Sequence, residues 1–148
     1  MSYILYLSTD FDLVKSPKKL KFINFYLATH QIPNNDFKIT RLDFSFPTVY
    51  RIIRTESSDI DIRAWSRDIE FSGPINWANE DIQNDSYQAS MELFDLIVYI
   101  NSFGFKVELI MKWWNEDLEN TDYEDFNLKS ISREDFFVYT NYKMRFIN

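Results

Sequence analysis

A dense group of carboxylates is the part of this chain whose residue types and spacing best suit chemistry. Residues 116–125 read E-D-L-E-N-T-D-Y-E-D, which is six carboxylates with no Lys or Arg among them. Paired carboxylates can serve as a general acid and base, as in glycoside hydrolysis, and clustered oxygens can hold a hard cation. The segment lacks the D-x-D-x-D-G spacing and the tight-turn glycine of an EF-hand, so that calcium site is excluded.

Simple counts remove most other catalytic sites. The chain has no Cys, one His (His30) and two Gly (Gly73 and Gly104), so it has no thiol nucleophile, no dinucleotide-binding glycine motif and no P-loop. The G-x-S-x-G motif is also absent. We therefore expect a protein that is not an enzyme, with no catalytic residues, no metal site and no cofactor; a small carboxylate- or metal-dependent enzyme is the alternative.

Aromatic residues beside the carboxylates point to binding instead. Trp113 and Trp114 alternate faces of a predicted strand, so Trp114 is left beside the acids when Trp113 enters the core. Aromatic anchors inside a charged rim are typical of a binding hot spot. The predicted partner-binding residues are Trp114, Glu116, Asp117, Glu119, Asp122, Tyr123, Glu124 and Asp125, with Asp59, Asp61 and Trp65 as a second acidic and aromatic candidate. The alternative is an ordinary exposed loop that confers solubility.

The charge distribution indicates what kind of partner would bind. Residues 1–54 carry eight Lys/Arg and four Asp/Glu (+4), and residues 55–148 carry eight and nineteen (−11), which together give the net charge of −7. Phosphate contact depends on Lys and Arg, so we expect no nucleic acid and no membrane as a partner of the acidic part. Acidic surface accelerates encounter with a positively charged protein, so a basic protein partner is predicted.

The elements that must position these residues are those of one α+β domain spanning residues 1–148. Strands are predicted at 3–8, 37–46, 59–65, 105–114 and 136–147, and residues 48–54 suit either a strand or a helical turn. A first helix is predicted at 17–30, and four lysines between Lys15 and Lys21 crowd its start, where an anion would relieve their conflict with the helix dipole. A second helix runs from a capping box at 85–88 to Gly104. The expected fold is a mainly antiparallel sheet of five or six strands with both helices on one face.

In size, acidity, aromatic surface and absence of catalytic motifs, the chain resembles bacterial toxin-immunity proteins, which neutralise contact-dependent growth inhibition or related polymorphic toxins. The resemblance implies a binding protein that captures a basic toxin domain, often a nuclease, and blocks its active site. The absence of cysteine and of a basic, apolar leader predicts a cytoplasmic protein. A structural or adaptor subunit with apolar contacts is the other alternative.

Overall fold

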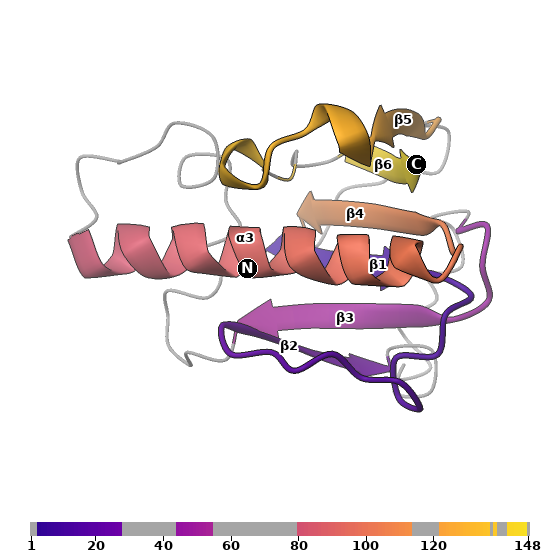
Figure 1. The fold of residues 1–148 in the computed structure, drawn as a ribbon, viewed down its shortest axis with the longest axis horizontal. Helices are drawn as coiled ribbons and strands as arrows, with labels where there is room; N and C mark the ends of the chain where they lie inside the picture. The colour runs from indigo at the N-terminus through magenta and orange to yellow at the C-terminus, as the bar shows by residue number, and fades with distance from the viewer. Residues whose placement is uncertain are drawn as a thin grey trace.

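The fold was obtained as a computed structural model, which describes residues 3–27, 44–54, 80–113, 122–136, 138 and 142–147. These residues form a six-stranded sheet and one long α-helix that runs across one face of it (Figure 1). The strands are β1 (Tyr3–Ser8), β2 (Ile23–Leu27), β3 (Val49–Arg54), β4 (Val107–Trp113), β5 (Glu124–Asn127) and β6 (Tyr142–Ile147). The helix is α3 (Glu80–Ser102), and two short 3-10 turns, η2 (Leu128–Ser130) and η3 (Arg133–Asp135), join β5 to β6.

The strand order is β2-β3-β1-β4-β6-β5, and the sheet is mixed. The pairings β2–β3, β3–β1, β1–β4 and β4–β6 are antiparallel, whereas β5 runs parallel to β6. The α+β class is thus confirmed. The expected mainly antiparallel sheet under two helices is corrected to a mixed sheet under one helix in the described residues.

The core lies between α3 and the sheet. Because side chains alternate along a strand, one face of β4 presents Val107, Leu109 and Met111 to the helix. Helix residues Leu93, Ile97 and Ile100, spaced three and four apart, are fully buried against this face. The opposite face of the sheet carries several buried polar groups, and these contribute to the candidate site.

The predicted first helix, residues 17–30, is wrong where the structure describes it. Residues 17–22 are irregular and residues 23–27 form β2, which pairs with β3. The Glu92 carboxylate, on α3, accepts hydrogen bonds from the backbone amides of Lys21, Phe22 and Ile23 at 2.7–2.9 Å. These contacts, about 70 residues apart in sequence, satisfy the amides without a helix. With no helix at residue 17, the predicted helix-dipole conflict of the lysines disappears.

The remaining predicted helices and strands agree with the structure in part. The strand at 3–8 is confirmed, residues 49–54 form a strand, and the strand predicted at 105–114 is β4. The helix predicted from 85 begins earlier, at Glu80, so the capping box does not start it; Gly104 follows its end with φ +89°, as expected. Residues 44–46 are bends rather than strand, and the final strand begins at Tyr142 rather than at Phe136. The predicted strands at 37–43 and 59–65 lie outside the described residues.

Candidate functional site

The end of the acidic run forms the edge strand β5. Of the predicted partner-binding residues, Asp122, Tyr123, Glu124 and Asp125 are described; Asp122, Glu124 and Asp125 are exposed and Tyr123 is half-buried. Sequence analysis treated this segment as binding surface or loop, and missed its parallel pairing with β6. Trp114, Glu116, Asp117, Glu119, Asp59, Asp61 and Trp65 lie outside the described residues.

A polar row across the sheet fixes β5 on the face away from α3. Ser8, Glu108, Arg145 and Asp125 are cross-strand neighbours on β1, β4, β6 and β5. The fully buried Glu108 carboxylate lies 3.0 Å from the Arg145 guanidinium, which also reaches Asp125 at 3.6 Å. Ser45 donates its backbone amide and its hydroxyl to Glu108 at 2.7 and 2.5 Å. The buried carboxylate is thus held by an arginine and a serine, and the same arginine positions Asp125.

The ring of Tyr123 contacts two cations of β6, Arg145 and Lys143. Its ring centroid is 4.8 Å from the Arg145 Cζ atom and 5.3 Å from the Nζ atom of Lys143, a lysine that is 1% exposed. Cations favour the electron-rich face of an aromatic ring, more so when they are shielded from water. Tyr123 and Asp125 therefore anchor the acidic strand to β6 as well as lying at its surface.

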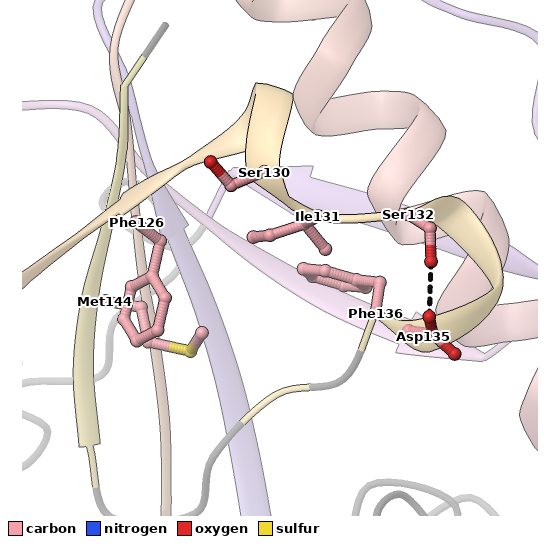
Figure 2. Close-up of a pocket in the computed structure, with 7 residues that line it drawn as sticks. All are labelled: Phe126, Ser130, Ile131, Ser132, Asp135, Phe136 and Met144. Atoms are coloured by element: carbon pink, nitrogen blue, oxygen red, sulfur yellow. Dashed lines mark hydrogen bonds between the residues drawn. The ribbon is translucent and has the colours of Figure 1, made fainter.

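A pocket of about 470 Å³ opens beside β5 on the other face of the sheet. Figure 2 shows the rings of Phe126 and Phe136, with Ile131 and Met144, turned toward one another around it. Ser130, Ser132 and Asp135 complete the lining, and the Ser132 hydroxyl donates to the Asp135 carboxylate. An apolar cavity with a few polar groups at its border is the usual form of a site for one large side chain or a small ligand.

Carboxylates are concentrated around β5, and Asp135 lines the pocket. Residues 122–136 carry five exposed acids and two exposed cations, Lys129 and Arg133, a net charge of −3. Arg133 is already engaged, because its guanidinium forms a two-pronged ion pair with Asp95 of α3 at 2.8 and 2.9 Å. That pair holds η3 against the helix and places Asp135 at the pocket. We call the pocket, with the exposed acids Asp122, Glu124, Glu134 and Asp135, the β5 surface; Asp125 lies on the opposite face of the sheet, beside Arg145.

Sequence reasoning missed the pocket residues, since it placed Phe136 in a strand. One signal was present: Ser132-Arg133-Glu134-Asp135 has the S-x-x-D spacing of a helix start. In the structure Ser132 is the N-cap of the short turn η3. The apolar lining comes from β5, from β6 and from Ile131 and Phe136 on either side of η3, so only their packing brings it into one place.

No group of three or more His, Cys, Asp or Glu side chains suited to a metal ion occurs among the described residues, and no helix described here has the length and apolarity to cross a membrane. Burial raises the pKa of Tyr50, which lies in the core under α3 rather than at the β5 surface. No protein-family model, curated protein or solved structure matches the chain.

Proposed function

We propose that this chain is a cytoplasmic binding protein that captures a basic protein toxin and blocks it, in the manner of bacterial immunity proteins. The observation that carries the proposal is an apolar pocket with the exposed Asp135 in its lining, beside the acidic strand β5. The expected partner contact is an apolar side chain of the toxin, flanked by Lys or Arg, with the side chain in the pocket and the cations on the β5 surface.

The pocket supplies the affinity in this proposal. Burying one Phe- or Leu-sized side chain is worth about 1.5–3 kcal/mol, and contacts of this kind dominate the energetics of interfaces. Phe126 and Phe136 are themselves supported, since Phe126 packs on Phe146 at 5.8 Å and Phe136 packs on Phe94 at 5.3 Å. This packing favours binding, because the Phe126 and Phe136 side chains lose little further conformational freedom when a partner is bound.

The carboxylates supply the rate of capture. A toxin has to be bound before it acts, and complementary charge raises association rates above the 10⁵–10⁶ M⁻¹s⁻¹ that is typical without steering. The net charge of −3 on residues 122–136, within a chain of net −7, has the sign that attracts a basic domain. Because exposed charges are screened by salt, capture should slow as ionic strength rises.

The test uses affinity capture from the native cell at low and at high salt, followed by association kinetics with the purified partner. In one variant Glu116, Asp117, Glu119, Asp122 and Glu124 become amides; Asp125 is kept because its carboxylate contacts Arg145. We expect association to slow at least tenfold and to lose most of its salt dependence. In the pocket variant Ser130→Trp, dissociation should quicken instead, since the ring fills the cavity.

The matched control is Asp10→Asn compared with Asp135→Asn, because each removes one exposed carboxylate and only Asp135 lines the pocket. The control should bind as the unaltered protein does. A partner that binds equally well to the five-amide variant, to Ser130→Trp and to the unaltered protein would overturn the proposal. So would a partner that is acidic.

A further inference from the structure

A second surface, at the C-terminal end of α3, exposes apolar rings and lysines. Phe103 and Phe105 follow the helix and are 54% and 37% exposed, and Val14, in the turn at 12–16, is 65% exposed. With Val98 they are the exposed large hydrophobic residues of the described chain. Exposed apolar residues that gather at one place mark an interaction site more often than scattered ones do.

The aromatic side chains of this surface are packed against one another. The ring of Phe11 is the centre: Phe103 stacks on it at 5.0 Å, Phe105 lies at 5.5 Å and Tyr99 meets it edge-on at 5.7 Å. The Tyr99 hydroxyl donates to the carbonyl of Ser16 at 3.1 Å, which holds the turn against the helix. Phe103 is therefore presented on a fixed support with about half of its surface open to solvent.

Its charge is opposite to that of the β5 surface. The chain segments that supply the rings, residues 10–19 and 99–106, carry Lys15, Lys18, Lys19 and Lys106 against the acids Asp10 and Asp12, a net charge of +2. Lys18 lies over the Tyr99 ring, with its Nζ atom 6.0 Å from the centroid. We call this the tip: the aromatic residues with Val14 and the four lysines.

The tip and the β5 surface complement each other in their apolar groups and in their charge. The tip offers exposed phenyl rings with Lys18 over the neighbouring Tyr99 ring, and the β5 surface offers an apolar pocket of about 470 Å³ with Asp135 in its lining. Tip-to-tip pairing would bring the lysines of two copies together, which like charges disfavour. The two surfaces share no residue: the tip is at the C-terminal end of α3, while η2 and η3 lie along its side (Figure 1).

From this complementarity we infer that the tip docks into the β5 surface of a second copy of this chain, with Phe103 entering the pocket. The contact is head-to-tail, so each copy keeps one surface of each kind open and assembly continues with concentration. The inference rests on the proposed role of the β5 surface as a receptor for apolar groups flanked by cations. It adds that self-association and capture of a basic partner compete for that surface.

The test is sedimentation velocity over a range of concentrations, at about 50 mM and about 500 mM salt, where the Debye length falls to a few ångströms. The apparent mass should rise above the monomer value of 17.9 kDa at low salt and return toward it at high salt. Phe103→Ser disables the tip and Ser130→Arg fills the pocket, so each variant alone should stay monomeric. Mixed in equal amounts they should form a 1:1 pair and nothing larger, since one tip and one pocket remain intact.

Thermal melting checks that the variants fold, and Lys18→Glu is a second tip variant that leaves the aromatic stack in place. The inference is overturned if the unaltered protein is monomeric at every concentration, if either folded variant still self-associates, or if the mixture does not pair. Its failure differs from failure of the proposed function. Phe103→Ser keeps the pocket and should still capture the basic partner. If no basic partner is found but the two variants pair when mixed, only the proposed function is overturned.

Discussion

Replacing Arg145 by Met should destabilise the protein strongly, because Arg145 alone joins the buried carboxylate of β4 to the acidic strand β5. Glu108 is fully buried and, among the described residues, would keep its two hydrogen bonds from Ser45. Breaking one side of a buried ion pair costs about 3–5 kcal/mol, and the value here falls toward the lower end because the Arg145 side chain is 31% exposed. The half-exposed pair with Asp125 adds about 0–1 kcal/mol. We expect a loss of about 3 kcal/mol in the free energy of unfolding, or about 6–12 °C in Tm for a chain of this size.

The assay is urea and thermal unfolding of Arg145→Met, Glu108→Gln and the double variant. Since the two side chains touch, the double variant should lose less than the sum of the singles, with a coupling of about 1–3 kcal/mol. Arg133→Met is the matched control: its pair with Asp95 is shorter and two-pronged but is more exposed, so its loss should be about 1 kcal/mol or less. A loss under about 0.5 kcal/mol for Arg145→Met, or strict additivity in the cycle, would refute the reasoning.

Three more predictions concern single contacts. Glu92→Gln should cost about 1–2 kcal/mol in urea unfolding, because a neutral amide accepts hydrogen bonds from the backbone amides of Lys21, Phe22 and Ile23 less strongly than the carboxylate does; no change would contradict that role. Gly104→Ala should cost about 1 kcal/mol because of its φ of +89°, and Gly104→Asn less; equal stability of all three in urea unfolding would refute the strain. Burial raises the pKa of Tyr50 above its ordinary value near 10, so the folded state binds this proton more tightly than the unfolded state does. The stabilisation is therefore full below about pH 10 and is lost as pH rises through the folded pKa. Spectrophotometric titration should show one tyrosine ionising late, and Tyr50→Phe should remove it; an unchanged titration would count against burial as the cause.

The local sequence pattern was sufficient to predict a helix or strand where one face of the element is apolar and its ends carry a clear signal. Strand β4 was predicted because alternate residues are apolar, and the structure buries Val107, Leu109 and Met111 against α3. The end of α3 was predicted because glycine adopts the left-handed conformation at low cost, and Gly104 does so. The acidity around β5 was likewise visible, since it depends on composition alone.

Long-range contacts decided the rest. Residues 23–27 have apolar spacing that suits a helix, yet pairing with β3 and the Glu92 carboxylate make them a strand, and neither partner is near in sequence. The same applies to β5, whose parallel pairing with β6 and contact with Arg145 cannot be seen in the acidic run itself.

The sequence by itself determined the class of the fold, the end of its main helix and the sign of its charge, because these follow from the period of apolar residues, from backbone sterics and from counting. Only the tertiary structure decided that Asp135 lines a pocket and that Asp125 is engaged in holding β5. An acidic run specifies charge, whereas a binding surface also requires apolar side chains from β5, from β6 and from the residues that flank η3 to meet, and that depends on strand order.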